Sequence, residues 1–245
     1  MDAALLVLFE VVVLLAAVVS GLTGFGFALV LGPILMLIID PKVVVPIVAV
    51  LSVVLNLFLF YSARRWAEPA KMAPLMAAGV AGMAAGILLL VFLNVTALKF
   101  LVSVVIISFS LAIMGNFRLQ ASDSRLDTLI VGLVSGFLGG STSMSGPPVV
   151  LFFSNQGYGK MAFRANLMAY FLVLYSVTLP GYWVGGLLTG EVFSFSALAI
   201  PALLAGSVLG ARLVPRVPEV RFRYLTLLLV LLTGLVTLAT SLHLF

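Results

Sequence analysis

Residues 135–148 read Ser-Gly-Phe-Leu-Gly-Gly-Ser-Thr-Ser-Met-Ser-Gly-Pro-Pro and interrupt an apolar segment where an unbroken membrane helix would be expected. Glycine weakens a helix interior because its backbone is too free. Proline lacks a backbone N–H and clashes with the preceding helical turn. Four glycines and a proline pair in one short stretch therefore predict a break in the helix.

A second stretch repeats this pattern in the first half of the chain. Residues 20–26 read Ser-Gly-Leu-Thr-Gly-Phe-Gly, and a proline follows at position 33. A shift of 115 positions places four residues of this stretch on identical residues of the other: Ser20 on Ser135, Gly21 on Gly136, Gly24 on Gly139 and Pro33 on Pro148. We interpret the two stretches as paired broken helices that meet to form an ion or solute site.

The composition indicates a polytopic membrane protein. Of 245 residues, 63% are hydrophobic and 9% are charged, and the mean hydropathy is +1.31. A soluble domain of this length does not bury so much apolar surface. The chain has no Cys and a single His, His243, which argues against disulfides, thiolate chemistry, haem and zinc clusters, so no cofactor is expected. The net charge of +5 is explained by basic loops that set topology, without a nucleic-acid partner.

Eight apolar blocks are visible, and two of them are too long for one membrane helix. A helix of about 20 residues crosses a bilayer, whereas the first block has 37 residues and the fifth has 28. These two contain the Gly-rich interruptions. The predicted fold is therefore all-α, with a broken or re-entrant first helix in each half; the blocks are 3–39, 43–63, 72–93, 97–115, 126–153, 162–184, 193–214 and 222–243.

The chain is expected to consist of two four-segment repeats, residues 1–118 and 126–245, joined by a polar linker at 116–127. A small-xxx-small pattern that allows close helix approach occurs at Gly82 and Gly86, and again at Gly206 and Gly210. If blocks one and five enter and leave on one side, eleven Lys and Arg residues share one face and only Lys42 and Lys99 lie opposite. This distribution fits the positive-inside tendency and predicts that the repeats are inverted, as in many secondary transporters.

An anion site is predicted where the two breaks meet. A helix start leaves backbone N–H groups unpaired, and the helix dipole is positive there, so an oxyanion such as sulfite or a sulfonate is held without a buried charge. A cation site would favour carboxylates or carbonyls. Close helix packing is the alternative explanation of these small residues. The candidate substrate-binding residues are Thr23, Gly24, Phe25, Gly26, Asn56, Ser141, Thr142, Ser143, Ser145, Gly146, Arg164 and Asn166.

Residues 135–170 resemble the sulfite exporter TauE/SafE family, also called the toluene sulfonate uptake permease family. The motifs that carry the resemblance are Ser-Gly-Pro-Pro-Val-Val-Leu at 145–151, Gly-Tyr-Gly-Lys at 157–160, Phe-Arg-Ala-Asn-Leu at 163–167, Tyr170, and the stretch 20–26. The resemblance extends over essentially the whole chain and implies a carrier of sulfur-containing or related organic anions in the bacterial inner membrane. The first-half motif departs from the family pattern at 27–33, which is more apolar here.

Several polar residues have two interpretations each. Arg164 either faces the solute or marks the cytoplasmic edge. Asn56 and Asn166 bind either the solute or a neighbouring helix. Glu10 is the candidate carrier of a coupling proton, unless it lies at the membrane interface. The sequence leaves open which anion is carried, in which direction, with a proton or a sodium ion, and in which oligomeric state.

Three other functions compete with the carrier. An anion channel would use the same broken helices. A membrane-embedded enzyme would need Ser145 as nucleophile and a base within reach, for which only Glu10 lies at membrane depth. A scaffolding protein would bind no solute. No Gly-Lys-Ser/Thr phosphate loop is present, so we do not expect ATP hydrolysis.

Overall fold

The computed structural model describes residues 3–94 and 124–218, together with residues 97, 100, 104, 221, 222 and 228. The blocks expected at 97–115 and 222–243, and most of the linker at 116–127, fall outside the described residues apart from these single positions.

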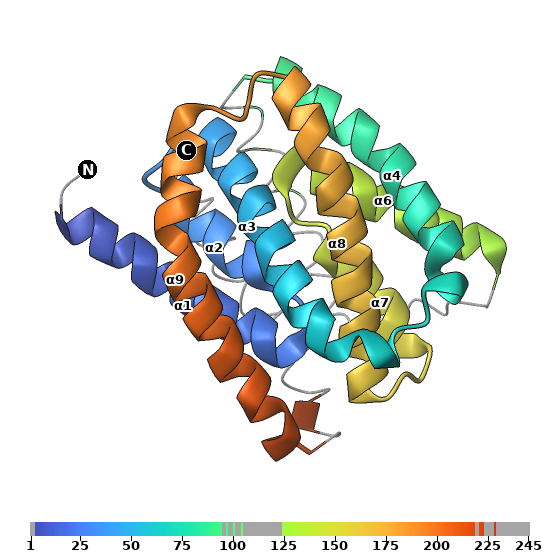
Figure 1. Cartoon of the computed structure of the whole chain (residues 1–245). Helices are drawn as coiled ribbons and strands as arrows, with labels where there is room; N and C mark the ends of the chain where they lie inside the picture. Colours follow the sequence, from blue (N-terminus) through green and yellow to red (C-terminus); the bar gives the residue numbers. More distant parts are fainter. Residues whose placement is uncertain are drawn as a thin grey trace.

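The described part is all-helical and contains no strand (Figure 1). It has eight α-helices, with a short 3₁₀ turn after α3 (Arg64–Trp66) and another after α9 (Val214–Arg216). The α-helices are α1 (Ala3–Thr23), α2 (Phe27–Met36), α3 (Pro41–Ala63), α4 (Pro69–Phe92), α6 (Arg125–Thr142), α7 (Gly146–Asn155), α8 (Lys160–Val184) and α9 (Gly190–Leu213).

Five of these helices are long and apolar enough to cross a membrane: α1, α3, α4, α8 and α9. The chain is thus a multi-pass membrane protein, as its composition predicted. In Figure 1, α3 and α9 run from top to bottom whereas α4 and α8 run from bottom to top. Each of α3 and α4 is therefore antiparallel to the helix in the corresponding position of the second half.

Both predicted helix breaks are present. The first segment ends as α1 at Thr23 and resumes as α2 at Phe27, and the fifth ends as α6 at Thr142 and resumes as α7 at Gly146. Each interruption begins with a residue of positive φ: Gly24 has φ 87° and Ser143 has φ 58°. A residue with this backbone conformation cannot continue a right-handed helix, which explains where α1 and α6 stop.

The two breaks are built alike, but at a shift of 119 positions rather than the expected 115. The hydroxyl of Thr23 bonds the carbonyl of Val19 at 2.9 Å, and the hydroxyl of Thr142 bonds the carbonyl of Leu138 at 2.7 Å. Each hydroxyl oxygen also accepts a hydrogen bond from the backbone N–H two residues on, that of Phe25 in the first break and of Met144 in the second. A threonine therefore terminates each long half-helix with the same local geometry.

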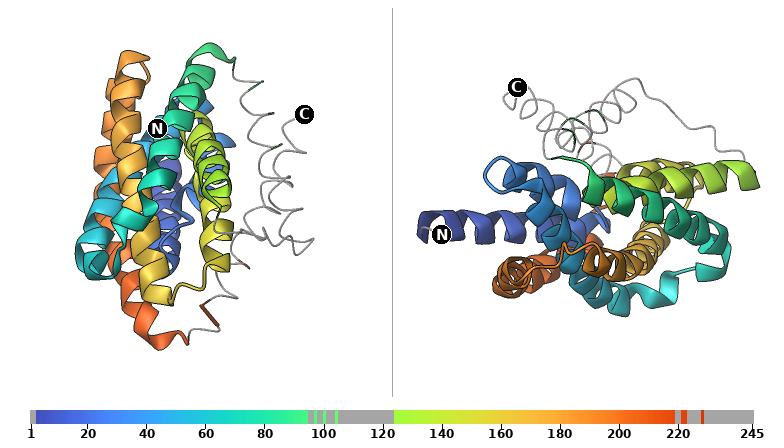
Figure 2. Two further views of the ribbon diagram at one scale, coloured as in Figure 1. Left: turned by 90° about the vertical axis from the view of Figure 1, so that its right-hand side faces the viewer. Right: turned by 90° about the horizontal axis from the view of Figure 1, so that it is seen from above.

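The broken helices pack crosswise between the two halves of the chain. α1 packs against α9, and α6 packs against α4 (Figures 1 and 2). Glycines make both contacts close: a methyl group at Gly82 would overlap the carbonyl oxygen of Leu133, and one at Gly206 would overlap that of Leu14. Leu14 and Leu133 are again 119 positions apart. The first and second halves of the described chain are thus interlocked through these contacts.

Candidate functional site

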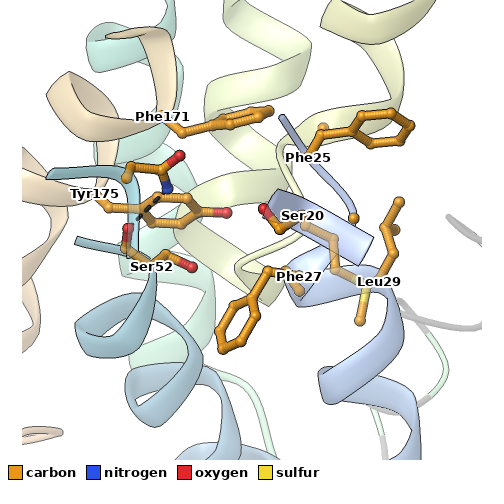
Figure 3. Close-up of a pocket in the computed structure, with 12 residues that line it drawn as sticks. Ser20, Phe25, Phe27, Leu29, Ser52, Phe171 and Tyr175 are labelled. Atoms are coloured by element: carbon orange, nitrogen blue, oxygen red, sulfur yellow. Dashed lines mark hydrogen bonds between the residues drawn. The ribbon is translucent and has the colours of Figure 1, made fainter. Parts of the chain in front are cut away.

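A small cavity lies between the two breaks, where α3 and α8 pass each other (Figure 3). Its volume of about 20 Å³ leaves room for roughly one water molecule. Four parts of the chain contribute lining residues. The first is the end of α1 together with the first break and the start of α2, and the second is α3. The third is the second break with the start of α7, and the fourth is α8. The lining residues are Ser20, Phe25, Gly26, Phe27, Ala28, Leu29, Ser52, Asn56, Met144, Gly146, Phe171 and Tyr175.

The start of α2 supplies backbone donors to this cavity. Counting from Gly26, Val30 is the first residue with a paired backbone N–H, which donates to the carbonyl of Gly26 at 3.0 Å. Within the described part of the chain, the four N–H groups of residues 26–29 have no hydrogen-bond partner, and no side chain caps the helix. All four residues line the cavity. The positive end of a helix dipole and several unpaired donors therefore meet at one place, which is the arrangement that binds anions.

Polar side chains of α1 and α3 add to these donors. Ser20 and Ser52 are buried and line the cavity, and their hydroxyls bond no other group among the described residues. Asn56 lies one turn beyond Ser52 and donates its amide to the carbonyl of Ser52 at 2.7 Å, while its buried Oδ1 has no partner in the described part of the chain. Figure 3 shows the side chains of Ser20, Ser52 and Tyr175 around a common space. The cavity thus holds hydrogen-bonding groups that no described residue uses.

Aromatic rings surround the polar groups. Phe25 and Phe27 come from the first break and Phe171 from α8, and all three line the cavity (Figure 3). Tyr175 lies one turn beyond Phe171, as Asn56 lies one turn beyond Ser52. The shift of 119 positions that relates the breaks also relates lining residues in pairs: Phe25 to Met144, Phe27 to Gly146, Ser52 to Phe171 and Asn56 to Tyr175.

The hydroxyls of the second break are engaged within the protein. Ser141 and Thr142 bond carbonyls of the preceding turn, Phe137 at 2.8 Å and Leu138 at 2.7 Å. Ser143 donates to the carbonyl of Val45 in α3 at 2.9 Å. These predicted site residues therefore hold the break in shape in this conformation.

Tyrosines of α8 fix the second break further. Tyr175 donates to the carbonyl of Ser143 at 2.5 Å, and its oxygen lies 3.1 Å from the hydroxyl of Ser145. Pro147 and Pro148 follow in the first turn of α7 and carry no N–H, so α7 offers fewer free donors than α2. Only Gly146 of the second-break candidates lines the cavity.

The charged and amide candidates lie elsewhere. Arg164 is buried, and its Nη2 donates to the carbonyl of Gly21 at 2.5 Å, which places a cation at the C-terminal end of α1. Its Nε has no partner among the described residues. Asn166 accepts a hydrogen bond from the N–H of Glu68 at 2.8 Å and so binds α8 to the turn before α4. Glu10 is half-buried on α1. None of Arg164, Asn166 and Glu10 lines the cavity.

Some of the predicted residues of the first break line the cavity, and the others hold the break in shape. Phe25 and Gly26 line the cavity, whereas Thr23 and Gly24 shape the turn. Gly24 lies against the backbone of Arg164, where a side chain would meet Cα at 2.9 Å. Asn56 was predicted to bind either the solute or a neighbouring helix. Its amide instead bonds the carbonyl of Ser52 within α3, and its oxygen has no partner among the described residues.

The sequence profile of the sulfite exporter TauE/SafE family matches residues 10–237. The chain belongs to this family. Members of the TauE/SafE family are membrane transporters and not enzymes, and the family implies a small anion as substrate. Among curated proteins and solved structures, none matches the chain.

Eight residues that line the cavity of this TauE/SafE protein were not among the candidate substrate-binding residues: Ser20, Phe27, Ala28, Leu29, Ser52, Met144, Phe171 and Tyr175. For Ser52 the sequence did contain a signal. Ser52 and Asn56 are spaced one helical turn apart in an otherwise apolar block, which places both on one face. Phe171 and Tyr175 have the same spacing, but they do not stand out from the neighbouring sequence, because aromatic residues are common in membrane helices.

Proposed function

We propose that this TauE/SafE protein carries small sulfur-containing oxyanions, sulfite- or sulfonate-like, across the bacterial inner membrane. In the proposal the anion binds in the cavity between the two breaks, with its oxygens on the N–H groups that begin α2 and on the hydroxyls of Ser20 and Ser52. The observation that carries the proposal is the set of N–H groups at the start of α2 that have no partner among the described residues and belong to residues lining one cavity.

The donor set favours an anion over a cation. The described residues that line the cavity include no Asp or Glu, and the one side-chain amide among them, that of Asn56, has an Oδ1 without a described partner. A cation would need several oxygen ligands, usually carboxylates or carbonyls, at this depth. The amide oxygen, which can only accept, suits an oxyanion that retains one proton, such as hydrogen sulfite. Arg164 adds a positive charge behind the first break without touching the cavity.

Two inverted repeats, 1–118 and 126–245, with re-entrant first segments, remain our proposal for how the site moves. Three observations support it: the antiparallel course of α3 and α8 (Figure 1), the equivalent crosswise glycine contacts, and the pairs of lining residues 119 positions apart. Transporters with inverted repeats bind substrate near the bilayer midplane and open alternately to either side.

In the proposal the cavity widens when the anion binds. A space for roughly one water cannot hold sulfite with its four heavy atoms, so we assign this conformation of the site to a closed state of the carrier. A carrier passes through such a conformation in each cycle. A proton or a sodium ion is the proposed coupling ion, and Glu10 is the proposed proton carrier on α1 because acids within membrane helices usually have a function.

A thermal-shift panel on the purified protein tests the proposal. Sulfite, sulfate, thiosulfate, sulfoacetate, taurine and acetate are compared at constant ionic strength and with one counter-ion. A bound anion stabilises by mass action, by about 2.7 kcal/mol at a concentration 100 times Kd. We expect sulfite or a sulfonate to raise Tm and acetate to have little effect. If no oxyanion raises Tm and a cation does, the proposal is wrong.

Flux into proteoliposomes then separates the carrier from the channel. We expect uptake of the anion identified in the panel to saturate with concentration and to respond to an imposed proton or sodium gradient. Flux that grows linearly with concentration would favour the channel.

A further inference from the structure

A groove on the surface between α3 and α9 is separate from the central cavity. Its volume is about 660 Å³, and most of its wall is apolar. Polar side chains occur at one end only, where Tyr61, Ser62 and Arg212 line it. The remaining lining residues are Val54, Leu57, Phe58, Leu59, Leu204, Val208 and Ala211.

The groove has the depth of one leaflet of a bilayer. It is lined by residues within 54–62 of α3 and 204–212 of α9, the last turns of two helices that contact each other and run in the same direction in Figure 1. Eight residue steps rise about 12 Å along a helix, and one leaflet contributes about 15 Å of hydrocarbon. With α3 and α9 crossing the bilayer, as their length and composition allow, the polar end of the groove would be near the boundary between hydrocarbon and headgroups.

Positive charge gathers at this end. Arg212 lines the groove, and the guanidinium of Arg64 lies 4.5 Å from the ring centre of Tyr61, which also lines it. Arg65 and Arg216 are in the 3₁₀ turns that follow α3 and α9. None of the described residues that line the groove is acidic. The groove is thus apolar along most of its length and has positively charged side chains at one end.

We propose that the groove binds an anionic phospholipid of the adjacent leaflet. One acyl chain lies along the apolar wall, and the headgroup phosphate is bound by Arg212 and Arg64. Basic pockets between membrane helices bind anionic headgroups in this way, and arginine forms paired hydrogen bonds with phosphate. A second copy of the chain fits less well, because a symmetric contact at this groove would bring the Arg212 side chains of both copies toward each other.

A fluorescent reporter placed in the groove tests this proposal. Phe58 lines the groove and is 44% exposed, so Phe58→Trp is made in a background in which the only two tryptophans are replaced, Trp66→Phe and Trp183→Phe. The variant is reconstituted into bilayers that mix brominated phosphatidylglycerol or brominated phosphatidylcholine with unbrominated lipid. Quenching then measures which lipid occupies the site. A control reporter, Leu88→Trp, lies on α4 and is 58% exposed.

We expect phosphatidylglycerol to bind at the reporter on position 58 at least about fivefold better than phosphatidylcholine, since each basic residue near the surface contributes about 1 kcal/mol. Arg212→Gln should reduce this preference about fivefold and Arg212→Lys should largely retain it. Arg125→Gln, the same charge change at the start of α6, should leave it unchanged. The reporter at position 88 should show no preference.

Three outcomes would overturn the proposal. Equal quenching by both lipids at position 58 would mean ordinary lipid contact. A preference that survives Arg212→Gln would place the phosphate elsewhere. Protection from both brominated lipids would mean that protein, such as a second copy, covers the groove. None of these measurements depends on transport, so they leave the proposed function independently testable.

Discussion

Ser52→Ala should weaken anion binding and Ser143→Ala should lower stability, although each substitution removes one buried hydroxyl near the cavity. The hydroxyl of Ser52 lines the cavity and bonds no described group, whereas that of Ser143 donates to the carbonyl of Val45 at 2.9 Å. The bond from Asn56 to Ser52 uses the backbone carbonyl and survives the substitution. In the proposed site, Ser52 therefore binds the anion and Ser143 supports the second break.

The expected magnitudes are set by these contacts. A hydrogen bond to a charged group contributes about 1.5–3 kcal/mol, so Ser52→Ala should weaken anion binding roughly 10- to 150-fold and change the free energy of unfolding by no more than about 0.5 kcal/mol. Ser143→Ala should lower that free energy by about 1 kcal/mol or less. Its effect on affinity should be small, because its hydroxyl is already used.

Isothermal titration of the detergent-solubilised protein with the anion identified in the thermal-shift panel measures the affinity. The Tm without ligand measures stability. If Ser143→Ala weakens binding more than Ser52→Ala does, while both variants keep the wild-type Tm, the anion contacts the second break and our assignment of donors to the first break is wrong.

Two further predictions test the close helix contacts and the sign of the bound charge. Gly82→Ala and Gly206→Ala should each destabilise the protein by about 1–3 kcal/mol, because the added methyl group overlaps a backbone carbonyl of the facing helix. The control Gly190→Ala, where nothing lies within 4 Å, should leave Tm within a few degrees of wild type. Equal Tm values for all three variants would contradict the close packing. Asn56→Asp should abolish anion binding in titrations, because it places a negative charge beside the bound anion in the cavity. If the folded variant instead binds a cation more tightly than the wild type does, the site is not an anion site.

The long helices could be predicted from hydropathy alone, and the errors in their bounds have a physical cause. The blocks predicted at 43–63 and 72–93 begin two and three residues after α3 and α4 do, at Pro41 and Pro69. Proline is favoured in the first turn of a helix, where its missing N–H is not needed, but it does not belong to an apolar run. Block ends agree more closely, because apolar side chains continue to the last turn.

The breaks were predictable in place but not in register. Matching residue types gave a shift of 115 positions, whereas the hydrogen bonds of Thr23 and Thr142 give 119. Glycines matched at a shift of 115 have different tasks: Gly24 adopts a positive φ, whereas its match, Gly139, has no positive φ and lies against the side chains of Met83 and Ser145. A match between letters cannot distinguish these tasks.

The candidate site was predicted in outline and only partly in its residues. The meeting of the breaks and the positions of Phe25, Gly26, Asn56 and Gly146 agree with the cavity in the structure. The hydroxyls of Ser143 and Ser145 in the second break have partners on α3 and α8, far away in sequence. No local sequence pattern indicates that a serine hydroxyl already forms a hydrogen bond within the protein. The sequence therefore overestimated how many hydroxyls are free to bind substrate. Whether these residues bind substrate remains a prediction.

The crosswise packing of α1 on α9 has a consequence for how the protein is made. Residues 24–189 must be synthesised before α9 begins to emerge, which takes on the order of 10–30 s at ribosomal speeds of about 5–20 residues per second. Throughout that interval the small-residue surface of α1 lacks its native neighbour and faces lipid or the insertion machinery. The docking of α1 on α9 is therefore a late step in the synthesis of the chain.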